Sequence, residues 1–127
     1  MNKYPWLEEY LLNKPETKSD FKVEWGWLRF TLRGKMFAAI CTPDVKYEPH
    51  SGRTMVILKC DPIMVPVFRE KYPDVVPGFY SNKENWNSVY LDGQLPDSEL
   101  KLMSDMSYNL VFSKLSKKLQ REIVSEA

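Results

Sequence analysis

The feature that most constrains the fold is a two-residue alternation of side chains that begins near Val23. In WGWLRFTL, residues 25–32, the apolar residues Leu28, Phe30 and Leu32 occupy every second position, and aromatic or polar residues occupy the positions between them. This period places the two sets on opposite faces of an extended chain. The stretch is therefore predicted to be a half-buried strand.

The alternation continues beyond this strand. Arg33 and Gly34 supply a tight turn, so KMFAAICT is the return strand of a hairpin. A loop rich in proline and glycine follows, and RTMVILK is then predicted to form a third strand. Three consecutive antiparallel strands form a meander that needs a cover on one face.

Helical patterns flank the meander. Residues 4–13 predict a short amphipathic helix, and KPETKSD after it is expected to be a solvated loop because proline and alternating charges break the pattern. A second helix follows CDP, with Asp61 as its N-cap. Because of Pro66, this helix is either kinked there or begins its regular part later, through VFREKY.

The last major helix starts at PDSEL, with Asp97 as the expected cap. Its apolar residues form one stripe. The members of this stripe are Leu100, Met103, Met106, Leu110 and Val111. The tail SKLSKKLQREIVSEA, which follows the helix, either extends it or packs as a separate helix.

One further strand is predicted within NKENWNSVYLDG, residues 82–93. Its alternation places Val89 and Leu91 on one face, with the larger aromatic residues on the other. Ser81 or Asn82 caps the turn that precedes it, and Asp-Gly turns the chain after it. Most polar residues of the stretch therefore serve the backbone.

The expected order is α-β-β-β-α-β-α, with one or two strands between the last two helices. It describes an α+β two-layer sandwich with a mainly antiparallel sheet and helices on one face. A chain of 127 residues is expected to form a single domain over residues 1–127, and a monomer rather than an oligomer. The residues expected in the core are Phe30, Leu32, Ile57, Val89, Leu91 and Leu110.

Charge and cysteine content limit the function classes. The 18 basic and 17 acidic residues nearly cancel, so any site for a polyanion must be local. No signal peptide and no apolar run of about 20 residues is present, and we expect a cytoplasmic protein without a membrane partner. Cys41 and Cys60 lie in apolar, strand-like segments and are expected to be buried free thiols.

Several segments resemble the MmcQ/YjbR family of small bacterial proteins. They are RGKMFAAI, LKCDP, YPDVVPGFYSNKENWNSVYLDGQLPDSEL and SYNLV, and the resemblance runs from about residue 22 to residue 115. It implies a CyaY-like (frataxin-like) α+β fold with a double-wing arrangement of β-hairpins. It also implies a DNA-binding role, which for this family is inferred largely from the fold.

No pattern indicates catalysis, a cofactor or a metal. His50 lies in a proline-flanked loop, and one histidine with two cysteines 19 positions apart gives no zinc or redox motif. No nucleophile motif or phosphate-binding glycine loop is present. We therefore expect a protein that is not an enzyme.

The candidate nucleic-acid-binding residues are Arg29, Arg33 and Lys35 of the first hairpin, with Lys83 and Trp86. Cations beside aromatic residues bind phosphates and stack bases. With three or four phosphates neutralised, log affinity for DNA should fall with log salt at a slope near −3. The alternative function is a protein-interaction module or chaperone-like adaptor.

Simpler interpretations also apply to these residues. If the hairpin face does not bind nucleic acid, it is either exposed to solvent or covered by a terminal helix. If Trp86 does not stack a base, it is an aromatic residue of the core. The remaining basic residues lie in the C-terminal tail and are expected to form the solvent-exposed face of a helix. They are Lys114, Lys117, Lys118 and Arg121.

Overall fold

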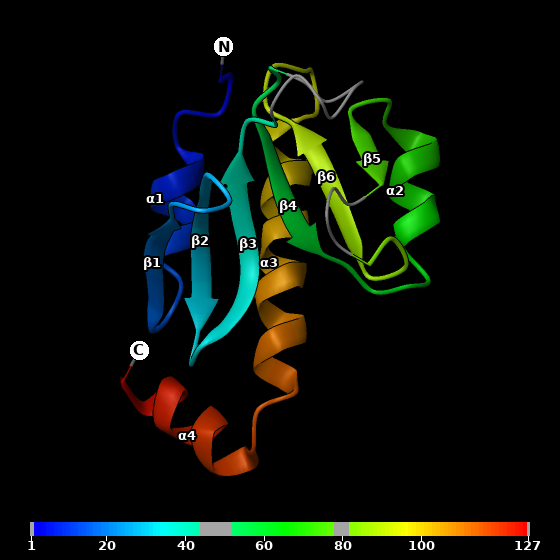
Figure 1. The fold of residues 1–127 in the computed structure, drawn as a ribbon. Helices are drawn as coiled ribbons and strands as arrows, with labels where there is room; N and C mark the ends of the chain where they lie inside the picture. Colours follow the sequence, from blue (N-terminus) through cyan, green and yellow to red (C-terminus); the bar gives the residue numbers. More distant parts are fainter. Residues whose placement is uncertain (1, 44–51, 78–81, 127) are drawn as a thin grey trace.

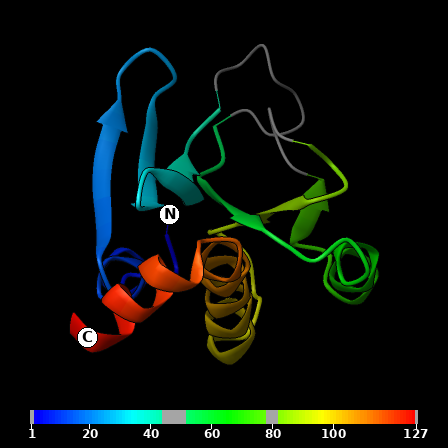
Figure 2. The ribbon, with the colours of Figure 1, turned by 90° about the horizontal axis from the view of Figure 1, so that it is seen from below.

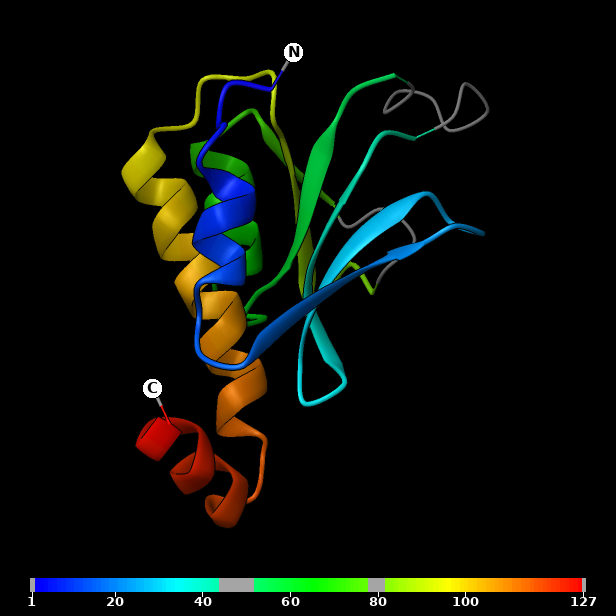
Figure 3. The ribbon, with the colours of Figure 1, turned by 90° about the vertical axis from the view of Figure 1, so that its left-hand side faces the viewer.

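The structure, a computed structural model, describes residues 2–43, 52–77 and 82–126. A six-stranded antiparallel sheet has the order β1-β2-β3-β4-β6-β5, and the helices lie on one of its faces (Figures 1 and 3). The elements are α1 (Leu7–Leu12), β1 (Thr17–Lys22), β2 (Trp27–Leu32), β3 (Lys35–Cys41), β4 (Met55–Lys59), α2 (Val65–Lys71), β5 (Val75–Pro77), β6 (Trp86–Tyr90), α3 (Asp97–Ser113) and α4 (Lys117–Glu126).

This architecture confirms the α+β fold class with helices on one face of an antiparallel sheet. The long helix α3 runs behind the centre of the sheet, with α1 beside it (Figure 1). Of the two possibilities for the tail, the separate helix is confirmed, because α4 starts after a break at Lys114–Ser116.

The prediction of a solvated loop over KPETKSD is wrong, because most of it belongs to β1. This edge strand pairs antiparallel with β2 from Thr17 opposite Leu32 to Lys22 opposite Trp27. Its side chains are mostly exposed, so it carries no buried alternation. Lysine and aspartate on such an edge also discourage pairing with other chains.

The turn between β2 and β3 is the one predicted. Arg33 and Gly34 have φ values of 50° and 81°, as in the tight hairpin turns whose twist matches that of the strands. The pairing register shifts between Phe30 and Thr31, which indicates a bulge near the end of the hairpin.

The regular part of α2 begins late, which confirms one of the two possibilities raised by Pro66. The helix starts at Val65, so Pro66 lies in the first turn, where a backbone N–H has no helical partner anyway. Asp61 is not its N-cap. Its carboxylate instead accepts the N–H of Ile63 at 2.9 Å in the turn that precedes the helix.

The prediction that Asp97 caps α3 is also wrong. Asp97 is the first helical residue and Pro96 precedes it, without a side-chain capping bond. A carboxylate in the first turn still interacts favourably with the helix dipole.

The main core lies between the sheet and the helices. Phe30, Leu32, Val89 and Leu91 are buried in it as predicted. Leu110 is only half-buried, so that prediction is wrong. The buried stripe of α3 is rotated toward Ser104 and Ser107, and its full membership is Leu100, Met103, Ser104, Ser107, Tyr108 and Val111.

A second apolar cluster lies on the opposite face of the sheet. It contains Ile57, which is buried as predicted, and the buried residues Trp27, Ala39, Cys41, Met55 and Tyr90. Cys41 and Cys60 are both free and buried. Burial raises the pKa of Cys41 to about 12 and that of Cys60 to about 11, so both thiols stay protonated near neutral pH.

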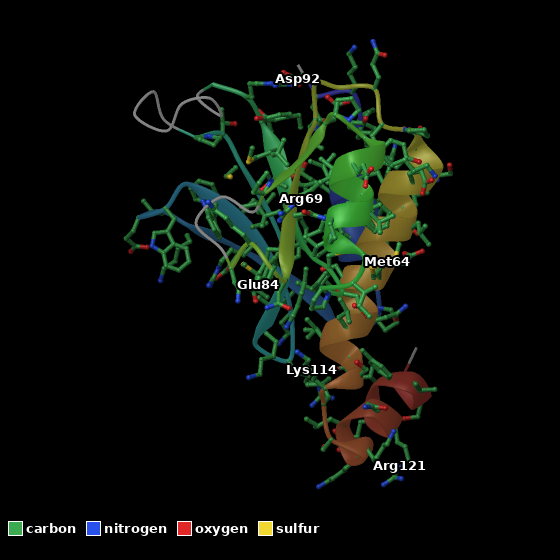
Figure 4. The ribbon with its side chains drawn as sticks, turned by 90° about the vertical axis from the view of Figure 1, so that its right-hand side faces the viewer. Met64, Arg69, Glu84, Asp92, Lys114 and Arg121 are labelled. Atoms are coloured by element: carbon green, nitrogen blue, oxygen red, sulfur yellow. The ribbon has the colours of Figure 1, made fainter. Side chains whose placement is uncertain are left out.

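Arg69 on α2 fixes the start of the 82–93 stretch (Figure 4). Its Nε donates to Oδ1 of the fully buried Asn87 at 2.7 Å, and its Nη2 donates to the carbonyl oxygens of Lys83 and Trp86. Asn82 accepts the N–H of Glu84 at 2.8 Å, so it caps the turn, whereas Ser81 lies outside the described residues.

The stretch ends at a close approach between Gly93 and Asp74. A Cβ on Gly93 would lie 2.3 Å from the carboxyl carbon of Asp74, and Oδ2 of the same carboxylate accepts the N–H of Gln94 at 2.8 Å. Any larger residue at this position would displace the Asp74 carboxylate from its bond to Gln94. Both ends of the stretch serve architecture, as the sequence predicts.

Candidate functional site

The β1–β2 hairpin ends in an exposed apolar tip. Residues 23–26 connect the strands, and Gly26 closes the turn with φ 68° and an N–H bond to the carbonyl of Lys22 at 2.8 Å. Phe21, Val23 and Trp25 are 60%, 78% and 55% exposed, and we call these three side chains the hairpin tip. Trp25 contacts Trp27 on the face away from the helices, whereas Phe21 lies on the other face with its partner Leu28. Apolar side chains exposed together at the end of a hairpin are candidates for an interaction site.

The hairpin carries this tip away from the helices. In Figure 3 the β1–β2 hairpin extends to the side of the sheet opposite α1 and α3, and Figure 2 gives the same arrangement from below. The tip is therefore open to a large partner.

Cations surround the indole of Trp25. Lys22 Nζ lies 5.4 Å and the guanidinium carbon of Arg29 5.9 Å from the ring centroid. Trp27, buried beneath, meets Trp25 edge to face at 5.5 Å. These contacts favour the observed orientation of the exposed indole.

Carboxylates balance most of this positive charge. Asp20 accepts two bonds from Arg29, at 3.0 and 2.6 Å, and Glu24 lies 3.8 Å from Lys22. The bonds from Arg29 lower the pKa of Asp20, so this carboxylate stays ionised at neutral pH. The tip offers a flat aromatic surface with little net charge.

The predicted site residues lie in three places. Arg29 is at the hairpin tip, whereas Arg33 lies about 13 Å farther along β2, at 3.3 Å per residue. Arg33 pairs with Glu16 at 2.8 Å and with Glu122 of α4 at 3.4 Å. These carboxylates separate the two arginines into local ion pairs instead of one positive stripe.

Lys35 lies next to Arg33 across the Arg33–Gly34 turn, whereas Lys83 and Trp86 lie at the start of β6. Lys35 is exposed at the start of β3, and Lys83 is exposed in the turn before β6. Trp86 is half-buried against the second apolar cluster, opposite Lys59 in the β4–β6 pairing. Trp86 is therefore mainly a packing residue.

Sequence reasoning missed the hairpin tip, and it did not place Lys59 and Lys114 near Lys35. Val-Glu-Trp-Gly lies between two extended segments and has the composition of a turn, which was a usable signal for the exposure of Trp25. Lys59 and Lys114 carried no such signal, because only the tertiary fold places them near Lys35.

Nothing in the described ranges suggests a metal centre or a membrane span. No group of three or more His, Cys, Asp and Glu side chains among residues 2–43, 52–77 and 82–126 is arranged to bind a metal ion. No helix in these ranges is long and apolar enough to cross a membrane. His50 lies outside the described residues.

The family assignment follows from comparison with known proteins. The YjbR family model matches residues 12–110, and the chain belongs to this family. The uncharacterized Escherichia coli protein YjbR is 28% identical over 118 residues, covering 93% of this chain and 94% of that one. The uncharacterized Escherichia coli protein YbdF is 32% identical over 94 residues, covering 74% and 71%.

Solved structures share the fold. The crystal structure of Deinococcus radiodurans protein DR2400, which contains the family domain DUF419, has a TM-score of 0.77 and 27% identity over 97% of this chain and 88% of that chain. A Pseudomonas syringae protein has a TM-score of 0.70 and 25% identity, covering 87% and 98%. These relatives support the family and the fold without assigning an activity.

Proposed function

We propose that this protein is a non-enzymatic nucleic-acid-binding protein that stacks unpaired bases on the tip of the β1–β2 hairpin. One observation carries the proposal: Trp25 is 55% exposed at the end of a projecting hairpin, with two cations beside its ring. Stacking of a base on such a ring contributes about 1–3 kcal/mol and tolerates every base.

Phosphate contacts are expected to contribute less to the affinity for nucleic acid than the sequence alone predicts. Arg29 and Arg33 already pair with carboxylates, so a phosphate must compete with Asp20 or Glu16 for them. Lys22 is the cation at the tip with the longest ion pair, at 3.8 Å. Two phosphate contacts at the tip correspond to a salt slope of about −1.4 for single strands, at about −0.7 per contact.

Exposed aromatic side chains favour single strands over duplexes. The flat face of Trp25 needs an unstacked base, and bases inside a duplex are already stacked. We therefore expect single-stranded DNA or RNA loops to bind more tightly than duplex DNA of the same length.

A protein partner is the second candidate. The near-balance of charge at the tip favours it, together with Val23, which is 78% exposed and has no ring to stack on a base. In that case the tip enters an apolar pocket of the partner, as buried aromatic anchors do at interfaces.

Fluorescence anisotropy at several salt concentrations tests the proposal. The folded protein should bind a labelled single strand more tightly than the matching duplex, with a salt slope near −1.4. Absence of binding to either at low salt contradicts the nucleic-acid function and favours the protein partner. Equal affinity for both forms contradicts stacking on Trp25.

A further inference from the structure

We propose that Lys35, Lys59 and Lys114 form a binding site for a phosphate-bearing anion at the end of the sheet where β3 begins and β4 ends. We call these residues the lysine triad. The site is separate from the hairpin tip and does not depend on the proposed function.

The three lysines come from three elements. Lys35 follows the Arg33–Gly34 turn, and Lys59 is the last residue of β4. The pairing of Ala38 with Leu58 places Lys35 and Lys59 near each other at one end of the sheet. Lys114 is the C-cap of α3 (Figure 4). Each lies at an end of its element, where a long side chain has room to reach solvent.

Ser107 explains the alignment of α3 with the two strands. Its buried hydroxyl donates to the carbonyl oxygen of Phe37 and accepts the N–H of Lys59 at 2.9 Å. Lys114 follows Ser107 by seven residues, or about two helical turns, and so lies on the same face of α3. The fold therefore places Lys114 beneath the ends of β3 and β4.

The triad has no acidic counterpart in the described part of the chain. Six other cations each lie within 4 Å of a carboxylate, whereas none of the three lysines forms such a pair with a described residue. Lys35 and Lys114 are exposed, and Lys59 is half-buried.

The like charges act on one another. Burial lowers the pKa of Lys59, and the neighbouring ammonium groups of Lys114 and Lys35 lower it further. The C-terminal dipole of α3, equivalent to roughly half a negative charge, offsets only part of three positive charges. A bound anion would offset the rest.

Three solvated lysines on a wet surface are the simpler interpretation. The half-buried position of Lys59 weighs against it, because a lone cation there would lose hydration without gaining a partner. Phosphate suits the triad since its oxygens accept several charge-assisted bonds at once and lysine binds it as a point charge. With two of the three lysines exposed, the site also has room for a phosphate that ends a larger molecule.

Thermal unfolding with pyrophosphate as the probe tests the site. Pyrophosphate should raise the melting temperature of the wild-type protein by about 5 °C or more above sodium chloride of equal ionic strength, because a ligand bound only to the folded state stabilises it. In Lys59→Met/Lys114→Met, which keeps the apolar stems, this gain should disappear.

The ligand-free variant provides an independent readout. Its melting temperature should equal or exceed that of the wild type, because removing two cations relieves repulsion. Lys3→Met is the matched control. Lys3 is an exposed lysine in the N-terminal segment, and the N-terminus lies at the end of the molecule opposite α4 (Figure 1). The Lys3→Met protein should keep the full gain.

A competition experiment distinguishes a nucleic-acid end from a small phosphorylated molecule as the ligand. A 5′-phosphorylated oligonucleotide that competes with pyrophosphate, while its unphosphorylated form does not, supports the site with a nucleic-acid end as ligand. Stabilisation by pyrophosphate without competition supports a small phosphorylated ligand. No gain above chloride in the wild type, or an equal gain in the double variant, overturns the proposal. Loss of single-strand binding by Trp25 variants leaves this result unchanged.

Discussion

Replacing Arg69 with alanine is expected to lower the free energy of unfolding by about 3 kcal/mol. The change removes the donors to Asn87, Lys83 and Trp86 at once. Asn87 is fully buried in β6, so its Oδ1 is left without a partner, which alone costs about 1–3 kcal/mol. Chemical denaturation monitored by circular dichroism measures the loss.

Arg29→Ala is the control for the loss of an arginine. Its carboxylate partner, Asp20, is exposed, and ion pairs of this kind contribute little to stability. An Arg69→Ala protein that is no less stable than Arg29→Ala would contradict the assigned role of Arg69. A further check is Asn87→Leu in the Arg69→Ala background, which should recover part of the loss, since it removes the unpaired amide.

Leu100→Ala is expected to cost about 2–5 kcal/mol, as large-to-small changes do in a packed core. Leu100 is fully buried on α3 against the sheet. Leu110→Ala, on the same helix, removes the same atoms from a half-buried position and should cost less than half as much. Equal losses in the two variants would show that the buried face of α3 is assigned wrongly.

The error at Leu110 has a physical cause. The sequence pattern marks apolar residues, but the centre of the buried face of α3 contains Ser104 and Ser107. Ser104 donates to the carbonyl of Leu100 at 2.8 Å, and Ser107 bonds to β3 and β4, so both hydroxyls are satisfied inside the core. A stripe defined by apolar type alone is therefore displaced to one side.

The strands show where alternation predicts and where it fails. β2, β3, β4 and β6 have a buried face, and the sequence predicts each of them. β1 is an edge strand with mostly exposed side chains, so it depends on pairing with β2 and has no pattern of its own. Strand pairing of this kind is a tertiary property.

The candidate site was predicted in part. Arg29 lies beside the exposed Trp25, in line with the expectation that cations of the first hairpin lie beside aromatic residues. The carboxylates that pair with Arg29 and Arg33 come from β1, from α4 and from the segment before β1. Their positions depend on the folded chain, so a count of cations along the sequence overstates the free positive charge.

The most direct test of the proposed function is the affinity of Trp25 variants for a labelled single-stranded oligonucleotide at low salt. If bases stack on the indole, Trp25→Ala should weaken binding by about 5- to 150-fold, equivalent to about 1–3 kcal/mol, and Trp25→Phe should retain most of the affinity. Val124→Ala, at an exposed apolar position on α4, is the matched control and should bind like the wild type. A folded Trp25→Ala protein with wild-type affinity would contradict the account.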